Sequence, residues 1–256
     1  MPIPTDRLTI FGVSLDRLTM NATVERCRQL IEAHRPAQHV SLNAGKVVLM
    51  KDDPRLRAIV SRSDLVSADG MSIVWAGRLL GSPIRERVPG IDLMSRLLEL
   101  AESKRWPVYF FGARAEVLAR FLAVVRRRHP RLLVAGHCDG YSVRGREAAE
   151  RIAASRARLL FVGISSPFKE YFLAEHLPKM GGMFAMGVGG SFDVWAGATR
   201  RAPGWMQRSG LEWLYRFLQE PHRMWRRYVF GNVRFAWLLA QERFRPAGSP
   251  AEGLME

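Results

Sequence analysis

Cysteine and long apolar runs are scarce in this sequence. Its 256 residues include two Cys, Cys27 and Cys138, which is too few for a disulfide framework or a cysteine-rich metal site. The N-terminal residues contain no apolar segment typical of a signal peptide. No apolar run approaches the roughly 20 residues that a membrane-spanning helix needs. These absences predict a cytoplasmic protein whose contact with a membrane would be peripheral.

The motifs of several enzyme classes are missing as well. The six His show no HxH, HExxH or His–Cys spacing, so no metal site is expected. The sequence contains no GxSxG hydrolase motif, no P-loop and no DxD motif. The early GxGxxG of dinucleotide-binding proteins is absent, so a nucleotide-dependent oxidoreductase is only an alternative. We therefore expect neither a metal nor a cofactor.

Short apolar segments alternate with helical patterns along most of the chain. This alternation predicts an α/β fold with a mainly parallel sheet. Most of the apolar segments lack a polar face, as expected of strands that helices cover on both sides. The expected strands are 8–13, 39–43, 64–69, 107–112, 131–136, 158–163 and 183–189. Helices are expected over 91–103, over 115–128 and from Pro167 to about Leu177.

The strand pattern stops after Asp193, and two helices are expected beyond it, at 210–219 and 221–242. The sequence thus predicts a body over 1–195, a helical appendage over 196–245 and a frayed tail over 246–256.

The segment 200–245 carries much of the positive charge. Ten Arg stand there against three Glu, with no Lys or Asp, which gives +7 of the chain's formal +15. Four of the seven Trp lie in the same segment. Arg interleaved with aromatic residues suits a surface that meets phosphates and an apolar medium together. The expected partners are anionic: nucleic acid, anionic lipid or phosphorylated substrates.

Two of the expected strands end in polar side chains that suit a substrate site. Asp69 follows the apolar DLVSA and would lie at the carboxyl end of its strand, where open α/β sheets bind ligands. Its carboxylate is a candidate general base for an acceptor hydroxyl, and a helix cap or turn is the alternative role. Ser41 and Asn43 end the preceding strand, where they would orient a sugar or cap the next helix.

Two further segments offer groups for phosphates and a nucleobase. Arg87 is a candidate for clamping a diphosphate with its planar guanidinium, and the alternative is a solvated surface side chain. In GVGGSFD, glycine would let backbone N–H groups approach a phosphate or a base at Gly187, Gly189 and Gly190. Asp193 would accept hydrogen bonds from a nucleobase or a ribose. A tight structural turn is the alternative.

The segment GISSPFKE, from Gly163 to Glu170, has the pattern of a ligand loop that opens a helix. The N–H groups of the helix start would hold an anion, and Lys169 would add a positive charge. A serine-rich helix cap is the competing interpretation. Gly112 ends another expected strand, and Tyr141 is expected either to pack over a ligand or to close a loop.

Taken in order, these segments resemble the WecG/TagA/CpsF glycosyltransferase family. The resemblance runs from about Ser41 to about Asn232 and follows the family's order and spacing throughout. It rests on SLNAGKV, DLVSADGMSIVWAGRLLG, ERVPGIDL, YFFGA, HCDGYS, GISSPFKE, GVGGSFDVWAG and RAPGWMQRSGLEWLYRFLQEPHRMWRRY.

The resemblance implies a Rossmann-like α/β body with a C-terminal helical appendage. It also implies an inverting, metal-independent transferase that moves a sugar from a UDP-sugar to a polyprenyl-diphosphate-linked sugar at the inner leaflet. Family activities include transfer of N-acetylmannosamine and N-acetylmannosaminuronic acid for wall and capsular polymers. The partners implied are the UDP-sugar, the lipid-linked acceptor, an anionic membrane surface and, as in family members that self-associate, further copies of the chain; nucleic acid is not among them.

The resemblance assigns roles to the candidate residues. It implies that Asp69 is the base, with Ser41, usually Thr in the family, and Asn43 as polar neighbours. It implies that Asp193 contacts uracil and that Arg87 corresponds to the arginine before the family's PG-I-D segment. The appendage arginines expected to close over the diphosphate correspond to Arg216, Arg223 and Arg226.

This chain departs from the family pattern in one segment. Where the family often has GxGxPKQE, this chain has GISSPFKE, so that Ser165 replaces the second Gly and Lys169 replaces the Gln. Because a Lys adds a positive charge beside the donor sugar, this departure favours a more anionic donor, such as a uronic acid.

The expected reaction is a single displacement. Asp69 deprotonates the acceptor hydroxyl, which attacks the anomeric carbon from the face opposite UDP. Arginines and backbone N–H groups would stabilise the charge on the leaving UDP, with Arg87, Arg216 and Arg223 as candidates. A nucleic-acid-binding α/β protein would also account for the basic charge. It would not account for an acidic residue at one strand end and a Gly-rich turn with Asp193 at another.

Overall fold

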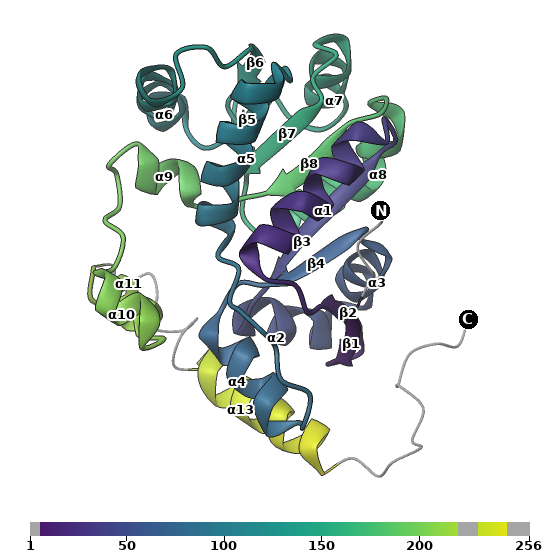
Figure 1. The fold of residues 1–256 in the computed structure, drawn as a ribbon, viewed down its shortest axis with the longest axis vertical. Helices are drawn as coiled ribbons and strands as arrows, with labels where there is room; N and C mark the ends of the chain where they lie inside the picture. The colour runs from purple at the N-terminus through teal and green to yellow at the C-terminus, as the bar shows by residue number, and fades with distance from the viewer. Residues whose placement is uncertain (1–5, 220–229, 245–256) are drawn as a thin grey trace.

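The computed structural model describes residues 6–219 and 230–244, and in them the chain forms an α/β fold (Figure 1). Within these residues, six strands form one sheet in the order β4-β3-β8-β7-β5-β6, and every neighbouring pair is parallel. The prediction of a Rossmann-like, mainly parallel sheet is therefore confirmed. The strands are β3 Ala37–Leu42, β4 Leu65–Ala68, β5 Val108–Gly112, β6 Val134–Cys138, β7 Leu159–Gly163 and β8 Phe184–Gly187.

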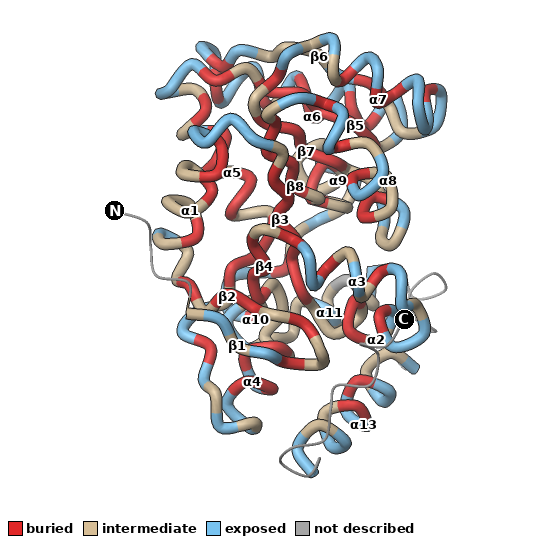
Figure 2. Tube along the Cα trace, turned by 90° about the vertical axis from the view of Figure 1, so that its right-hand side faces the viewer, coloured by how far each residue is buried: buried red, intermediate tan, exposed pale blue. Residues whose placement is uncertain are grey.

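Helices cover both faces of the sheet and leave the strands as a buried middle layer (Figures 1 and 2). The helices of the body are α1 Met20–Glu32, α2 Ala44–Asp52, α3 Pro54–Arg62, α4 Met71–Leu79, α5 Gly90–Lys104, α6 Ala115–Arg128, α7 Gly145–Ala154, α8 Phe168–His176, the 3-10 helix η1 Leu177–Lys179 and α9 Ser191–Trp195. The helices expected at 91–103, at 115–128 and after Pro167 are found as α5, α6 and α8.

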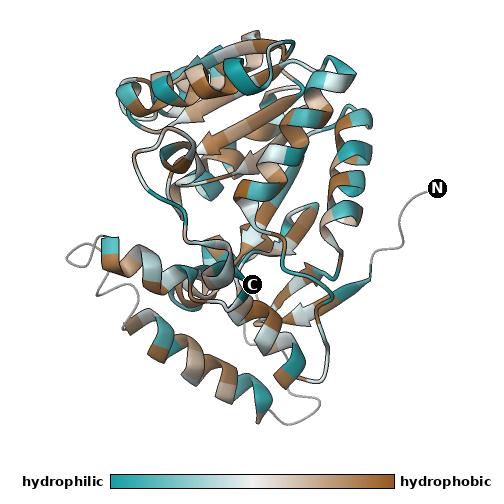
Figure 3. Ribbon diagram, turned by 60° about the vertical axis from the view of Figure 1, so that its left-hand side comes forward, coloured by the Kyte–Doolittle hydropathy of each residue, from teal (hydrophilic) through white to brown (hydrophobic). Residues whose placement is uncertain are grey.

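Side chains of each strand alternate between the two covered faces, as strand geometry requires. Phe110 and Phe161 pack in one core cluster with α1, α5, α6 and α9. Phe111 and Val162 face the opposite side and pack with α7 and α8. Figure 3 shows the result as apolar strands at the centre and polar colour on the outward faces of the helices. Burial of both faces explains why these strands read as continuous apolar runs.

The prediction of one strand over 8–13 is wrong. The chain forms a hairpin there, with β1 Arg7–Ile10 antiparallel to β2 Val13–Asp16. Phe11 and Gly12 both have positive φ, 51° and 73°, which is the backbone of a two-residue hairpin turn. Gly12 is a turn signal, but Phe11 hides it because bulky residues rarely adopt positive φ.

The strand predicted at 131–136 is displaced, because β6 begins only at Val134. The N–H of Arg131 donates to the Glu102 side chain at 2.7 Å, and the N–H of Leu132 donates to the His129 carbonyl at 3.1 Å. Both groups therefore belong to the turn that follows α6 and not to the sheet.

Beyond α9, the described chain continues as α10 Gly204–Arg208, α11 Glu212–Gln219 and α13 Gly231–Arg243. α11 matches the helix predicted at 210–219, and α13 covers the later part of the helix predicted at 221–242. Among the described residues, none of the helices is both long and apolar enough to span a membrane.

α13 packs beside α2 and the N-terminal hairpin (Figure 1). Phe235 and Leu238 belong to the same core cluster as residues of β3 and β4, and the Phe235 ring lies 5.4 Å from the ring of Phe11. Arg234 forms an ion pair with Asp52 of α2. Part of the predicted appendage is thus packed on the body, and the boundaries 1–195, 196–245 and 246–256 remain a prediction.

The parallel arrangement brings six carboxyl strand ends to one edge of the sheet. From β3 the chain moves outward to the edge strand β4, and from β5 it moves outward to the opposite edge strand β6. Open α/β sheets bind ligands outside the carboxyl ends of the strands, where the connections diverge. The fold therefore predicts a ligand site along this edge of the sheet.

Candidate active site

Asp69 lies at the carboxyl end of β4 and faces the start of α5. Its Oδ1 accepts a hydrogen bond from the N–H of Gly90, the first residue of α5, at 3.1 Å. It does not cap α4, whose N-cap is Gly70 without a side-chain hydrogen bond. The N–H groups at a helix start favour a carboxylate. The Asp69 side chain is therefore held by one oxygen, and its Oδ2 makes no hydrogen bond with the described residues.

The surroundings of Asp69 make it a stronger base than a solvated carboxylate. Burial raises the pKa of the Asp69 carboxyl above its ordinary value, and the nearby Glu212 carboxylate raises it further. The Gly90 N–H, Arg87 and Lys46 oppose this shift only in part. A carboxylate with a raised pKa binds a substrate proton more readily, which suits general base catalysis.

Ser41 and Asn43 both lie beside Asp69 but differ in the hydrogen bonds that their side chains make. The Ser41 Oγ is buried and has no hydrogen-bond partner among the described residues. A Cβ added to Gly90 would stand 3.1 Å from this oxygen, so Ser41 lies against the residue that holds Asp69. Asn43 accepts a hydrogen bond from the N–H of Lys46 at 3.0 Å and caps α2. The capping alternative is confirmed for Asn43, whereas the Ser41 Oγ is a buried polar group without a hydrogen bond to the described residues.

A buried cluster of three charges joins α2 to α8 beside these residues. The Lys46 Nζ donates to Glu170 Oε1 at 2.7 Å, and the Lys169 Nζ lies 3.6 Å from the same oxygen. Ser166 bridges the pair, since it donates to Glu170 at 3.0 Å and accepts from Lys169 at 2.9 Å. The three side chains of Lys46, Glu170 and Lys169 are 4%, 1% and 11% exposed. The cluster has two cations for one carboxylate and therefore a net positive charge.

The cluster shifts the ionisation of its own members. Burial alone would raise the pKa of Glu170, but Lys46 and Lys169 outweigh it and lower the pKa to about 2. Burial and the neighbouring Lys46 lower the pKa of Lys169 to about 8, against the opposing effect of Glu170. Lys169 thus remains charged at neutral pH and loses its proton in mildly alkaline solution.

The glycine turn after β8 lies over this cluster. A Cβ at Gly187 would stand 2.6 Å from the Lys169 side chain, so glycine leaves room for the lysine there. Gly189 has φ of 51°, but its N–H, like that of Val188, donates to the Val162 carbonyl. These two N–H groups are used by the sheet and are not free for a phosphate.

Gly190 and Asp193 belong to the start of α9. Gly190 is the N-cap of α9 and makes no side-chain capping bond, and Asp193 lies in the first turn of this helix. Asp193 is partly buried, two strands away from Asp69 in the sheet order. Two strand spacings amount to about 10 Å, which is the separation of the ends of β4 and β8 in the sheet.

Arg87 contacts the appendage. Its Nη1 donates to Glu212 Oε2 of α11 at 3.1 Å, and its side chain is 14% exposed. Arg201 approaches the same carboxylate and is also bound to Asp92 at the start of α5. Arg87 is therefore not the solvated surface side chain of the alternative interpretation.

An open hollow of about 350 Å³ adjoins Arg87 between α4 and α10. Its lining combines both signs of charge with one apolar side chain, from Met71, Glu86, Arg87, Gly204, Gln207 and Arg208. Two guanidinium groups facing one hollow are suited to a phosphorylated ligand.

The other half of the sheet, formed by β7, β5 and β6, carries Gly112, Gly163 and Tyr141 at or after its strand ends. A Cβ at Gly112 would meet the Gly163 backbone at 2.7 Å, and one at Gly163 would meet the Phe192 ring at 2.4 Å. Packing therefore accounts for both glycines. Tyr141 follows the edge strand β6, five strand spacings or about 24 Å from β4. Its ring is exposed, and the Arg144 guanidinium lies 5.7 Å from its centre.

The predicted appendage arginines are only partly covered by the structure. Arg216 belongs to α11, and Arg223 and Arg226 lie outside the described residues. Among the residues that are described, no group of three His, Cys, Asp or Glu is placed to hold a metal ion.

Lys46, Arg201 and Glu212 were missed by the sequence interpretation. Lys46 had a local signal, because it is the one charged residue within SLNAGKV. Arg201 and Glu212 had none, since each is one charged residue among many in a basic segment. Their partners, Asp92 and Arg87, lie more than 100 residues away in the chain.

A buried carboxyl group, guanidinium groups and a buried cationic cluster at the carboxyl edge of a parallel sheet suit an α/β enzyme that acts on phosphorylated substrates. Comparison with known proteins defines this class further. The model of the family described as "Glycosyl transferase WecG/TagA/CpsF family" matches residues 8–249. The chain therefore belongs to the WecG/TagA/CpsF glycosyltransferase family. The predicted family and enzyme class are confirmed, in place of the nucleic-acid-binding and oxidoreductase alternatives.

Two relatives are named as N-acetylglucosaminyldiphosphoundecaprenol N-acetyl-beta-D-mannosaminyltransferase. The protein from Bacillus spizizenii is 39% identical over 177 residues, which cover 69% of this chain and 68% of the relative. The protein from Bacillus subtilis is 32% identical over 171 residues, which cover 67% of this chain and 66% of the relative.

The charge cluster predicts a large effect of Glu170→Gln on stability. Removing the carboxylate leaves Lys46 and Lys169 buried without a counter-ion, and breaking a buried pair costs about 3–5 kcal/mol. Lys46→Met should cost less, because Lys169 then still neutralises Glu170. Urea unfolding of the variants measures both free energies.

Glu147→Gln is the matched control for Glu170→Gln. Glu147 forms an ion pair with Arg151 on the surface of α7, where both side chains are more than half exposed. Its loss should change the free energy of unfolding by about 0.5 kcal/mol or less. Equal effects of Glu147→Gln and Glu170→Gln would contradict a stabilising role of the buried cluster.

Proposed function

We propose that this protein is an inverting, metal-independent glycosyltransferase that moves a sugar from a UDP-sugar to a polyprenyl-diphosphate-linked sugar. The observation that carries this proposal is the geometry of Asp69. One of its oxygens is held by the Gly90 N–H, its pKa is raised, and it lies within electrostatic reach of Arg87. A base beside a guanidinium is what transfer from a diphosphate leaving group requires.

The reaction proceeds by single displacement. Asp69 takes the proton of the acceptor hydroxyl, and the acceptor oxygen forms a bond to the anomeric carbon from the face opposite UDP. The bond between that carbon and the UDP oxygen breaks, so UDP leaves with the electron pair. Arg87 and the appendage arginines Arg216 and Arg223 stabilise the charge that develops on UDP. Ser41, whose Oγ is unpartnered among the described residues, donates to or accepts from the reacting sugars.

The names of the relatives guide the choice of substrates. Both act on N-acetylglucosaminyl-diphosphoundecaprenol as N-acetylmannosaminyltransferases, according to their names. We therefore take a lipid-linked N-acetylglucosamine as the first acceptor to test and UDP-N-acetylmannosamine as the first donor. Such products serve cell-surface polysaccharides.

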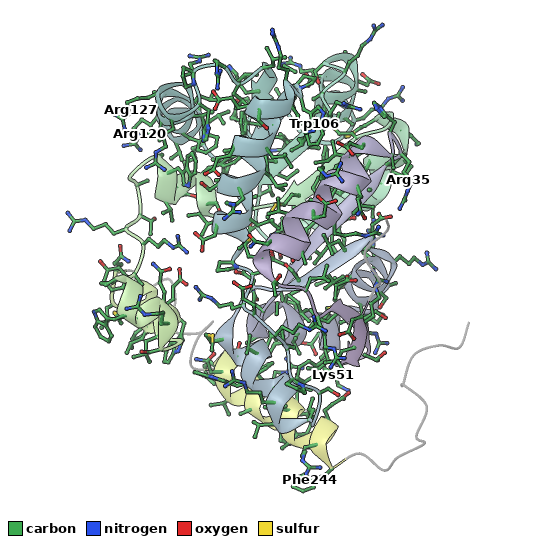
Figure 4. The ribbon with its side chains drawn as sticks, in the orientation of Figure 1. Arg35, Lys51, Trp106, Arg120, Arg127 and Phe244 are labelled. Carbon is green, nitrogen blue, oxygen red and sulfur yellow. The ribbon has the colours of Figure 1, made fainter. Side chains whose placement is uncertain are left out.

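A peripheral membrane position completes the proposal. The chain carries large exposed apolar side chains on α10 and α13, namely Trp205, Trp237 and Phe244, which are 58%, 55% and 83% exposed. Phe244, at the end of α13, points away from the body (Figure 4). Exposed aromatics in a segment rich in Arg suit the boundary between lipid headgroups and acyl chains. The active edge would then face the lipid-linked acceptor on the cytoplasmic side of the membrane.

Asp69→Asn should lower kcat by about 10²- to 10⁴-fold, because a positioned base contributes about that factor. The affinity for UDP should stay within about twofold, since the amide keeps the size of the carboxylate. Asp193→Asn is the matched control and should weaken UDP binding more than it lowers kcat. Transfer from UDP-N-acetylmannosamine to the lipid-linked acceptor and calorimetric titration with UDP measure these quantities.

Two results would contradict the proposed function. Full activity of Asp69→Asn would remove this residue from the role of base. Failure of UDP to raise the melting temperature of the wild-type protein, at concentrations that saturate nucleotide sites, would remove the proposed donor class. NAD should leave the melting temperature unchanged.

Lys169 should select for an anionic donor through its positive charge. The ratio of kcat/KM for UDP-glucuronate to that for UDP-N-acetylmannosamine should then fall as the pH rises through about 8, where Lys169 loses its proton. In Lys169→Gln this ratio should be low at every pH. The charged groups around Lys169 are Lys46, Glu170 and Asp69, and Glu170, whose pKa is lowered to about 2, remains ionised in this range. A ratio that is independent of pH and unchanged in the variant would sink this idea.

Replacement of Trp205, Trp237 and Phe244 by Ala should weaken binding to anionic vesicles more than tenfold, because a buried aromatic side chain contributes about 1.5–3 kcal/mol. Co-sedimentation with phosphatidylglycerol vesicles measures the affinity. Leu133→Ala is the control, since Leu133 is exposed beside β6 at the far edge of the sheet. Unchanged binding by the triple variant would place the membrane contact elsewhere.

A further inference from the structure

Glu212, in the first turn of α11, stands between two arginines. Its Oε2 accepts a hydrogen bond from Arg87 Nη1 at 3.1 Å, and its Oε1 lies 3.8 Å from Arg201 Nε. The three side chains come from separate parts of the chain: the segment before α5, the segment after α9, and α11. They converge within electrostatic reach of Asp69.

The guanidinium of Arg201 is fixed by a second carboxylate. Its Nη1 and Nη2 donate to the two oxygens of Asp92 at 2.6 and 2.7 Å. This two-pronged contact with the first turn of α5 sets the plane of the group. The remaining donor edge of Arg201, at Nε, therefore faces Glu212.

This remaining donor is not satisfied. Arg201 Nε is buried and has no hydrogen-bond partner among the described residues, because 3.8 Å exceeds hydrogen-bond distance. A buried donor without a partner is unfavourable. The planar Glu212 carboxylate thus accepts a hydrogen bond from Arg87 but not from Arg201 Nε. A group with more acceptor oxygens and more negative charge would serve both.

We propose that Arg201 is a second guanidinium for the substrate diphosphate and that the Glu212 carboxylate holds the place of the diphosphate until the substrate binds. This inference rests on the proposed function for the identity of the anion. A phosphate group offers three acceptor oxygens in three directions, so one group can accept from Arg87 Nη1 and from Arg201 Nε together. Glu212 then turns outward to the solvent.

The exchange needs little rearrangement. Glu212 is 34% exposed and makes no ion pair with described residues other than these two arginines, so rotation of its side chain is enough to release it. Partly exposed ion pairs are weak, whereas a diphosphate held by two guanidinium groups makes charge-assisted hydrogen bonds to both. Glu212 keeps the arginines charge-balanced in the absence of substrate and competes with weakly charged anions.

Glu212→Gln is the decisive variant. It keeps the size of the side chain but removes the competing charge, so UDP and inorganic pyrophosphate should each bind about two- to fivefold more tightly, as expected for the loss of one partly exposed ion pair. Isothermal titration calorimetry measures both dissociation constants. Glu147→Gln, on the surface of α7, should leave them unchanged. If Glu212 instead anchored α11 in a productive position, Glu212→Gln would weaken binding.

Arg201→Gln tests the second guanidinium. Loss of a charge-assisted hydrogen bond should weaken pyrophosphate and UDP binding by about tenfold or more. Asp92→Asn is the matched control, because it breaks the same ion pair but keeps the Arg201 guanidinium. Binding weakened equally by the two variants would mean that Arg201 only anchors the chain, and would overturn its assignment as a diphosphate contact.

The outcomes separate this inference from the proposed function. If the wild-type protein binds pyrophosphate but not UDP, and Glu212→Gln binds pyrophosphate more tightly, the exchange at Glu212 is supported and the proposed UDP-sugar donor is contradicted. If the wild-type protein binds UDP, and Glu212→Gln binds it equally or more weakly, the proposed donor is supported and the exchange at Glu212 is contradicted. Absence of binding of either anion by both proteins overturns the exchange as well.

Discussion

The buried ion pairs of the Glu170 carboxylate with Lys46 and Lys169 are the interaction on which the candidate active site depends. It joins α2 to α8 across 124 residues of sequence and fixes the ends of the segments that follow β3 and β7. Burying three charges is unfavourable unless they are compensated, and the contact of Lys46 with Glu170 Oε1 together with the bridge through Ser166 supplies part of that compensation. The cluster leaves one positive charge in excess, directly under the glycine turn after β8.

The strand ends of the sheet differ in what they position. β4, β3 and β8 present Asp69, Ser41 and the turn at Gly187, where side chains approach a common space. At the ends of β5 and β7, Gly112 and Gly163 are required because their neighbours leave no room for a side chain. A glycine at a strand end can therefore mark close packing as readily as a ligand. The two cases differ only in what stands opposite, which the sequence does not record.

The sequence predicts the sheet well because its strands are buried on both faces, which leaves continuous apolar segments between helical patterns. It fails at the N-terminal hairpin, where Phe11 adopts a backbone conformation that local propensity disfavours. At the site, Asp69 and Asn43 have the same local pattern, a polar residue between a strand and a helix. Asn43 caps its helix, but Asp69 turns to the N–H of Gly90, 21 residues further on. Contacts of this kind, like those of Glu212 with Arg87 and Arg201, depend on the tertiary fold and leave no trace in local pattern.

The packing of α13 against the first hairpin has a consequence for how the appendage can move. α10 and α11 lie between α9, which is packed in the body core, and α13, whose Phe235 and Leu238 are buried with the strands of the opposite end of the chain. A segment fixed at both ends samples far fewer arrangements than a free tail, so ordering it around a ligand loses less conformational entropy. In the described residues, α10 and α11 thus lie between two helices that are both packed on the body.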